Sequence, residues 1–587
     1  MKKRSAVGGR VRHLVGFAVV ASLVAAACGG DDDDDGSTSG TDAAATATSE
    51  TPADTAAGSA PSTAGSTATS AGSDATAGTD ATAGTDAAAP ETTAGDPLAG
   101  DGELSTTAPE VDPDGAIRFG YTLSPSQGLD PHKTSLSQDT VWLAPIYDPL
   151  IIEMPDASLV PGLATEWEFV DDNTALELTL REGVTFQDGT PFDAEAVKIN
   201  IERAKTVEGS AVAPLLGTID TVEVVDPMTV RLHVNGPAAT LPRILADRPG
   251  MMISPAAIND PNLSQNPVGA GMYQVQEYRP GDRAIMVPFE DYWNPDWVKL
   301  GQLEIVAQAE ALTRLNGLRS GELDLALMDP TTYEQAGDSG LATEEFSTTS
   351  STYLHLNRTR AHFDDQRVRQ AINHAIDRNA ILEAVYLGYG HASSQYYSPE
   401  FTPGYVEGMD DRYPYDPDKA RELLAEAGLA DGFSFDLLVP ALVTSQGIAQ
   451  IVQSQLAEVG ITVNFIGIEA SQTASTFFND KVGDMVVGGS PGRTDPANLV
   501  QLFFTETANS NPGGHTIPEV SALYDEAMVN RPEDERAPIL LDLMEAVTES
   551  AGEIWLLQPT TLLAGSEDVA GFHWSLRGQP DFRGTGM

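Results

Sequence analysis

The residues best suited to covalent chemistry form a G-x-S-x-G pattern at 488–492, with Ser490 at its centre. This spacing is typical of the nucleophile elbow of serine hydrolases, and Asp495 and a histidine downstream could complete a triad. However, Pro491 follows the serine and has no backbone N–H, so the oxyanion would lose a donor worth about 3 kcal/mol. We also expect the following RTDPAN to form a turn instead of the helix that the elbow requires. The pattern therefore predicts no catalysis at Ser490.

Metal and nucleotide chemistry have no support in the sequence. The nine histidines are scattered, without an HExxH, a His-x-His or a Cys/His cluster. The single cysteine excludes an intramolecular disulfide and any multi-cysteine metal site. A GxxxxGK[ST] phosphate-binding loop is also absent, which excludes a P-loop ATPase. We predict a protein that is not an enzyme and carries no cofactor or metal.

The length and the charge of the chain narrow its architecture and its partners. A chain of 587 residues predicts two or three domains, with room for a cleft between them. The 33 basic and 86 acidic residues give a net charge of −53, which disfavours binding to nucleic acid or to an anionic membrane surface.

Cys28 is placed as in a bacterial lipoprotein signal. A basic start at 2–12 precedes an apolar run from Leu14 to Ala27, and small residues lead directly to Cys28. This pattern predicts a signal peptide at 1–28, cleaved before Cys28, with lipidation of that cysteine. A plain secretory signal or a transmembrane anchor is the alternative, although the apolar run is short for a span of about 20 residues.

The segment 29–114 consists almost entirely of Ala, Thr, Gly, Ser and Asp, including five consecutive aspartates at 31–35. Such a composition cannot bury a core, so it predicts a disordered acidic tether. Weak calcium binding by the aspartate run is the alternative to a solvated spacer.

The remainder alternates helical and strand patterns. Asp416, Pro417 and Gly428 mark the cap, first turn and end of one amphipathic helix. A second helical pattern stops at Gly460 and runs into the β-branched stretch 461–468. Asp193 and Asp377 are placed to cap two further helices. These units predict α/β lobes packed around sheets.

Two neighbouring stretches, LVPGLATEWEFVDD (159–172) and ALELTLREGVTFQDGTPFDAEAV (175–197), resemble the signature of the bacterial extracellular solute-binding proteins, family 5, which include the oligopeptide and dipeptide binders. Further family stretches follow the same order: GLDPHK (128–133), NPVGAGMYQV (266–275), LHLNRTRAHFDDQRVRQAINHAID (354–377), YDPDKARELLAEAGLADGF (415–433) and QLAEVGITV (455–463). The resemblance covers nearly all of the chain from residue 117 onward.

The resemblance implies an α/β, two-lobed periplasmic-binding-protein-like fold of type II, in the peptide-binder subclass, with a hinge between the lobes. It implies that lobe I, with an inserted extra domain, spans 115–352 plus 558–587, and that lobe II spans 353–557. It also implies a monomeric lipoprotein outside the cytoplasm, on the cell membrane or in the periplasm. Such a protein captures an oligopeptide, a dipeptide or a related polar solute for an ABC permease and ATPase. A ligand-sensing receptor or chaperone-like protein on the same fold is the alternative.

The resemblance also implies binding residues. In peptide binders, a Trp and an Asp in a loop of lobe II contact the peptide, and the Asp pairs with its amino terminus. Matched to GDMVVGGSPGRTDPAN (483–498), the Trp position falls on Ser490, next to Gly489, and the Asp position falls on Arg493. The reversed charge implies a carboxylate-bearing, phosphate-bearing or sugar-like ligand. A shifted alignment would instead bring Asp495 to the amine-binding position.

In lobe I of the peptide binders, the segment after the position of Lys133 lines the cleft. The resemblance therefore implies that Ser135 and Ser137 are polar ligand contacts. Ordinary loop hydroxyls are the alternative interpretation of these two serines.

We predict that Cys28→Ala releases the protein from the membrane fraction, because the acylated thiol is the expected attachment. Fractionation followed by immunoblotting measures this, with wild type as the reference. Retention of the variant at wild-type levels would contradict lipidation at Cys28.

Overall fold

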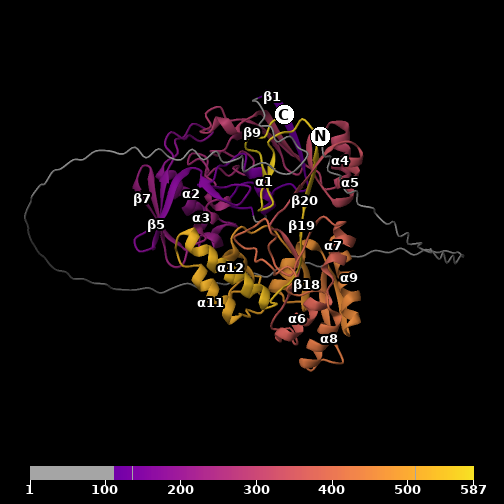
Figure 1. The fold of residues 1–587 in the computed structure, drawn as a ribbon. Helices are drawn as coiled ribbons and strands as arrows, with labels where there is room; N and C mark the ends of the chain where they lie inside the picture. The colour runs from indigo at the N-terminus through magenta and orange to yellow at the C-terminus, as the bar shows by residue number, and fades with distance from the viewer. Residues whose placement is uncertain (1–111, 135–136, 509) are drawn as a thin grey trace, which may run out of the picture. The chain divides into compact units, whose positions relative to one another are not determined.

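The computed structural model describes residues 112–134, 137–508 and 510–587 (Figure 1). The predicted signal peptide, and the predicted tether up to residue 111, lie outside the described residues. The predicted tether boundary at 114 is wrong, because residues 112–114 belong to strand β1 (Asp112–Tyr121), which pairs with the sheet. Within the described ranges, no helix combines the length and the apolar character that crossing a bilayer requires.

Three helices begin where the sequence predicts an aspartate cap. The carboxylates of Asp193, Asp377 and Asp416 each accept a hydrogen bond of 2.9–3.0 Å from the backbone N–H three residues later. The helices that they cap are α2 (Ala194–Thr206), α7 (Arg378–Tyr386) and α8 (Pro417–Glu426). These predictions are confirmed, as is the strand that follows Gly460.

Lobe I is built on a seven-stranded sheet with the order β13-β20-β12-β1-β11-β10-β9. The strands are β1 (Asp112–Tyr121), β9 (Tyr273–Arg279), β10 (Arg283–Pro288), β11 (Leu300–Ala307), β12 (Leu325–Met328), β13 (Ala342–Phe346) and β20 (Thr561–Gly565). β1 runs parallel to β11 and β12, and the other pairs are antiparallel. Helices α4 (Ala311–Ser320) and α5 (Pro330–Asp338) pack beside β12 and β20. The short helix α1 (Thr140–Leu143) contributes to the core of this lobe.

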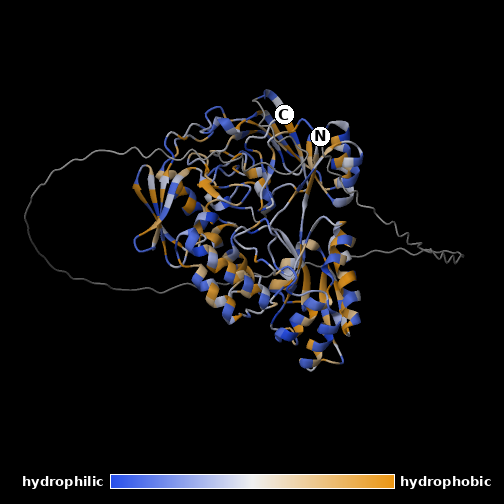
Figure 2. Ribbon diagram, viewed as in Figure 1, coloured by the Kyte–Doolittle hydropathy of each residue, from blue (hydrophilic) through white to orange (hydrophobic). Residues whose placement is uncertain are grey.

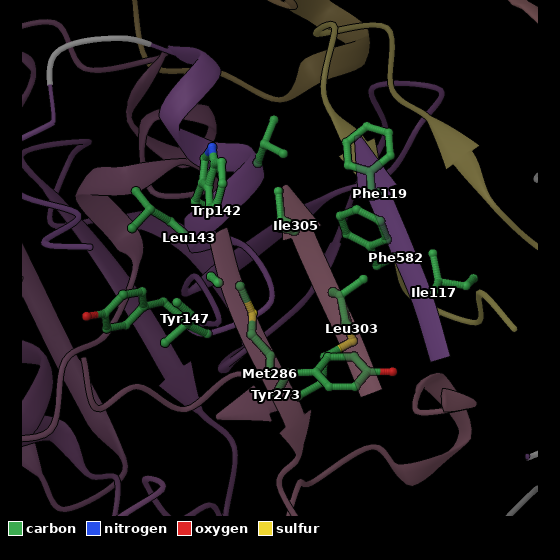
Figure 3. Close-up of a cluster of buried hydrophobic side chains, with 14 of the residues drawn as sticks. Ile117, Phe119, Trp142, Leu143, Tyr147, Tyr273, Met286, Leu303, Ile305 and Phe582 are labelled. Atoms are coloured by element: carbon green, nitrogen blue, oxygen red, sulfur yellow. The ribbon is translucent and has the colours of Figure 1, made fainter. Parts of the chain in front are cut away.

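The core of lobe I joins segments that are distant in the sequence. Phe119 on β1 and Ile305 on β11 lie close to Phe582 of the C-terminal segment, and Trp142 of α1 closes one side (Figure 3). The rings of Phe119 and Phe582 meet edge to face, with centroids 5.6 Å apart. This packing holds the C-terminal segment against lobe I.

Lobe II is built on a six-stranded sheet with the order β15-β19-β14-β18-β16-β17. The strands are β14 (Ser351–Leu356), β15 (Gly390–Ala392), β16 (Phe433–Pro440), β17 (Ile461–Ile468), β18 (Met485–Ser490) and β19 (Ile554–Pro559). Besides α7 and α8, its helices are α6 (Gln366–Ala375), α9 (Val443–Glu458), α10 (Pro496–Phe503), α11 (Pro518–Ala527) and α12 (Glu533–Glu549). Figure 2 shows hydrophobic and hydrophilic residues side by side along these helices, as expected of amphipathic helices that cover a core.

An additional small domain, the inserted domain, interrupts lobe I. Its antiparallel sheet has the order β5-β6-β8-β7 and packs against α2. Its strands are β5 (Ala164–Val170), β6 (Ala175–Leu180), β7 (Ile219–Asp226) and β8 (Thr229–Val234). Shorter elements complete the described chain: β2 (Ser126–Leu129), β3 (Ile151–Glu153), β4 (Leu159–Pro161), α3 (Leu241–Ile244), β21 (His573–Trp574) and β22 (Pro580–Asp581).

Two short crossovers form the hinge between the lobes. Residues 347–350 join β13 to β14, and residue 560 joins β19 to β20. Because β13 pairs with β20 in lobe I and β14 pairs with β19 in lobe II, the crossovers lie side by side. The lobe boundaries predicted at 352/353 and 557/558 fall inside β14 and β19.

The edge of the lobe II sheet next to the second crossover is secured by Asp410. This carboxylate accepts hydrogen bonds from the side chains of Ser393 at 2.7 Å, Gln395 at 3.0 Å and Tyr405 at 2.8 Å. The Nε2 atom of His391 on β15 lies 3.1 Å from Asp410 Oδ2. Burial alone would raise the pKa of Asp410, but these partners outweigh it and lower the pKa to about 2.

We predict that Asp410→Asn destabilises the fold at pH 7 by on the order of 2 kcal/mol. The folded pKa lies below the ordinary value of 3.8, so the carboxylate stabilises the fold above pH 3.8 and loses this effect as the pH falls towards 2. Urea unfolding at several pH values should show the difference from wild type shrinking below pH 4. Asp418→Asn, at an exposed carboxylate on α8, is the control. A pH-independent difference would contradict this origin of the stability.

Candidate functional site

A cavity of about 660 Å³ lies between the two lobes and is lined by residues from both. Lobe I contributes residues around α3, including Arg243 and Asp247, together with Arg577 of the C-terminal segment. Lobe II contributes the loop that links β18 to α10, including Gly492 and Arg493, and the exposed face of α11. The volume is within the usual range of about 300–1,000 Å³ for small-molecule sites.

Close backbone packing positions the lobe II loop. A Cβ atom on Gly492 would lie 2.5 Å from the carbonyl oxygen of Arg577 and 2.7 Å from the hydroxyl of Thr349 in the first crossover. Thr349 is itself bonded to this segment, because its backbone N–H donates to the Leu576 carbonyl at 2.7 Å. Glycine at position 492 therefore lets the loop, the crossover and the C-terminal segment meet directly before Arg493.

An ion-pair network closes the wall between the lobes. The guanidinium of Arg577 donates to Glu153 Oε1 at 3.0 Å and to Oε2 at 2.6 Å, and it lies 3.2 Å from Asp247 Oδ2. From lobe II, the Thr494 hydroxyl donates to Glu153 Oε2 at 2.8 Å. Burial would raise the pKa of Asp247, but the nearby positive charges, first that of Arg577, lower it. Glu153 is therefore hydrogen-bonded by protein partners, whereas Asp247 is held by its ion pair with Arg577, and its Oδ1 atom has no hydrogen-bond partner among the described residues.

Asp495 lies behind the cavity wall and is fully engaged. Its two oxygens accept hydrogen bonds from the Arg536 guanidinium at 2.7 and 2.9 Å, and both side chains are at most 2% exposed. Asp495 also caps α10 by accepting from the N–H of Ala497 at 2.9 Å. A ligand amine would have to compete with a buried, bidentate arginine for this carboxylate.

The expectation that RTDPAN lacks a helix is wrong, because α10 begins at Pro496. An aspartate cap followed by Pro in the first turn is itself a helix start signal, and it outweighs the turn propensity of these residues. The helix begins too late to act as the helix of a nucleophile elbow, since Pro491 to Asp495 separate it from Ser490.

Ser490 ends β18 and is buried. Its hydroxyl accepts a hydrogen bond from Tyr396 at 3.2 Å and donates to the Pro491 carbonyl at 3.1 Å. In the described part of the chain, no hydrogen bond joins it to Asp495 or to His515. The hydroxyl is thus used within the fold, and the pieces of a hydrolase triad are not connected.

The other predicted contacts are placed differently. Gly489 is exposed on β18 opposite Thr352 and is not part of the cavity wall. Ser135 and the side chain of Ser137 lie outside the described residues. The cavity residues Arg243, Asp247 and Arg577 were not predicted, because nothing in their local sequence distinguishes them from other surface charges.

The fold and the interlobe cavity define a class, the two-lobed periplasmic binding proteins of the peptide-binder type. The family model for bacterial extracellular solute-binding proteins, family 5, matches residues 158–511. The chain belongs to this family, whose members serve ABC importers outside the cytoplasm, and the resemblance inferred from the motifs is confirmed.

Two curated relatives are similar to the chain over more than two thirds of their own length. The chain is 33% identical over 355 residues to the glutathione-binding protein GsiB of Salmonella paratyphi A, covering 59% of this chain and 68% of that protein. It is 29% identical over 484 residues to GsiB of Pectobacterium atrosepticum, covering 78% and 91%. Both relatives are named as glutathione-binding proteins.

Solved structures share the fold. The binding protein AgaA of A. tumefaciens R10 in complex with agropinic acid has a TM-score of 0.66 and 25% identity, covering 78% of this chain and 95% of that chain. NikA of Brucella suis with Fe(III)-EDTA has a TM-score of 0.71 and 24% identity, covering 80% and 99%.

We predict that Arg536→Met destabilises the protein by about 3–5 kcal/mol, because it leaves the Asp495 carboxylate buried and unpaired. Urea unfolding measures the effect. Arg421→Met, at an exposed i,i+3 pair on α8, is the matched control and should change little. An unchanged unfolding midpoint for Arg536→Met would show that Asp495 is free for another role.

Proposed function

We propose that this protein captures a peptide or a related small polar solute in the interlobe cavity and delivers it to the permease and ATPase of an ABC importer. The observation that carries the proposal is the cavity itself, since its wall is assembled from both lobes next to the two crossovers. A solute bound there contacts both lobes at once, so binding energy favours the closed arrangement.

The contacts across the cavity support closure by a hinge. Thr494 of lobe II donates to Glu153 of lobe I, and Asn530 of lobe II bonds to the inserted domain. The Asn530 side chain accepts from the N–H of Ala238 at 2.9 Å and donates to the carbonyl of Asn173 at 2.8 Å. Because contacts of this kind are polar and few, the lobes can separate and rejoin at the crossovers. Solute can then enter and leave.

The anchor and the location follow from Cys28. A lipidated Cys28 attaches the chain to the outer face of the cell membrane or holds it in the periplasm, and residues 29–111 connect the anchor to the fold. The protein acts as a monomer with the permease and ATPase as partners, and it neither binds nucleic acid nor catalyses a reaction.

The ligands named for similar proteins narrow the class of solute that we propose. GsiB proteins are named for glutathione, AgaA was solved with agropinic acid, and DppA of Helicobacter pylori was solved with the peptide STSA. Glutathione and STSA are peptides, and agropinic acid is by name an acid. We therefore propose a peptide or a related organic acid, a solute with polar, ionisable ends.

We predict that glutathione, agropinic acid or a short peptide such as Met-Leu raises the melting temperature of the full chain. A solute at 100 times its dissociation constant stabilises the folded state by about 2.7 kcal/mol. Thermal unfolding with each solute is the measurement.

A matched pair of variants localises the effect. Leu215→Trp places a large ring in the cavity wall and should reduce the shift, whereas Leu312→Trp, at an exposed leucine on α4 away from the cavity, should not. Equal shifts in both variants would contradict binding in this cavity. No shift with any of these solutes at millimolar concentration would contradict the proposed solute class.

A further inference from the structure

Arg493 is the unusual charge in the cavity wall. Three arginines line the cavity, and in the described part of the chain Arg577 and Arg243 each have carboxylate partners. Arg493 has none within 4.0 Å among the described residues, and no hydrogen bond of its side chain is formed with them. Its Nε atom is inaccessible to solvent and unpartnered.

An unpartnered guanidinium N–H in a partly buried position is costly. Native proteins satisfy nearly all buried donors, because a donor removed from water without a partner loses the free energy of hydration. The described part of the fold around Arg493 does not supply this partner: Asp247, whose pKa the Arg493 charge helps to lower, lies within ion-pair distance of Arg577 but not of Arg493. Such an exception is expected where a ligand completes the arrangement.

The balance of buried charge indicates the sign of that ligand. Arg577 pairs with Glu153 and Asp247. Arg243 pairs with Glu153 and with the exposed Glu533, and it also donates to the Ala157 carbonyl at 2.7 Å. Two further acidic residues of the wall, Glu506 and Asp525, are exposed and therefore hydrated. Among the three arginines that line the cavity, Arg493 is thus the one without a carboxylate partner in the described part of the chain.

We propose that Arg493 is the anion-binding residue of the cavity and that the transported solute presents an oxyanion, a carboxylate or a phosphate, to its guanidinium. The proposal deepens the solute-capture function and rests on it for the identity of the cargo. The anion site itself is defined by the protein and can be tested with simple anions.

The first experiment needs no identified solute. The full chain is melted in sodium acetate, sodium phosphate or glutathione, each against sodium chloride of equal ionic strength. We expect wild type to be stabilised beyond chloride, with acetate and phosphate separating carboxylate from phosphate preference. Arg493→Met should weaken the apparent affinity for the effective anion at least tenfold, whereas Arg493→Lys should retain part of it.

The second experiment compares unliganded variants. Arg493→Met should unfold at the same or a higher urea concentration than wild type, because it removes an unpaired charge. Arg577→Met should unfold at a lower urea concentration, since it leaves Glu153 and Asp247 without the Arg577 guanidinium. A loss of stability in Arg493→Met as large as in Arg577→Met would show a structural role for Arg493 and overturn the proposal.

The outcomes separate this inference from the proposed function. An equal response of wild type and Arg493→Met to every anion, or no response of wild type beyond chloride, overturns the anion site. If a peptide and its C-terminal amide also bind wild type and Arg493→Met equally well, the proposed solute capture remains supported without an anion site at Arg493. Conversely, loss of the acetate or phosphate response in Arg493→Met supports the anion site even when no peptide, agropinic acid or glutathione binds.

Discussion

The buried ion pair between Arg577 and Glu153 is the interaction on which the site depends. Glu153 lies at the end of β3, and Arg577 belongs to the C-terminal segment that returns to lobe I after the second crossover. A carboxylate and a guanidinium removed from water are stable together and costly apart, so each holds the other in place. Because the Arg577 carbonyl also touches Gly492, the pair determines where the lobe II loop can lie.

This arrangement couples the hinge to the cavity. Thr349 of the first crossover is bonded to Leu576, next to Arg577, and Thr494 of the loop is bonded to Glu153. A rotation at the crossovers must therefore shift or break contacts in the cavity wall. The exchange of a few hydrogen bonds and one polar cluster is small enough for a bound solute to influence, which is the physical requirement for closure driven by binding.

The arginines at and behind the cavity wall fall into two groups: those paired with carboxylates stabilise the fold, and the unpaired one is available to a ligand. Arg577 and Arg536 are satisfied by Glu153 and Asp495, so they stabilise the fold and have little left to offer a ligand. Ser490, despite its hydrolase-like pattern, is occupied by Tyr396 and Pro491. The role of a charged or polar side chain near the cavity thus depends on whether the protein supplies its partner, and Arg493 differs from the other two arginines in having none among the described residues.

The sequence by itself determined the elements and the family: the caps at Asp193, Asp377 and Asp416, the strand after Gly460, and the ordered motifs. These features depend on neighbours a few residues apart, so local rules suffice. Only the tertiary structure decided that Asp495 turns inward to Arg536 while Arg493 lines the cavity, a choice that the sequence left open. It also brought Glu153 and Arg577, 424 residues apart, into one ion pair. Such pairs form because packing of the lobes removes specific charges from water together, and no local pattern records which charges those will be.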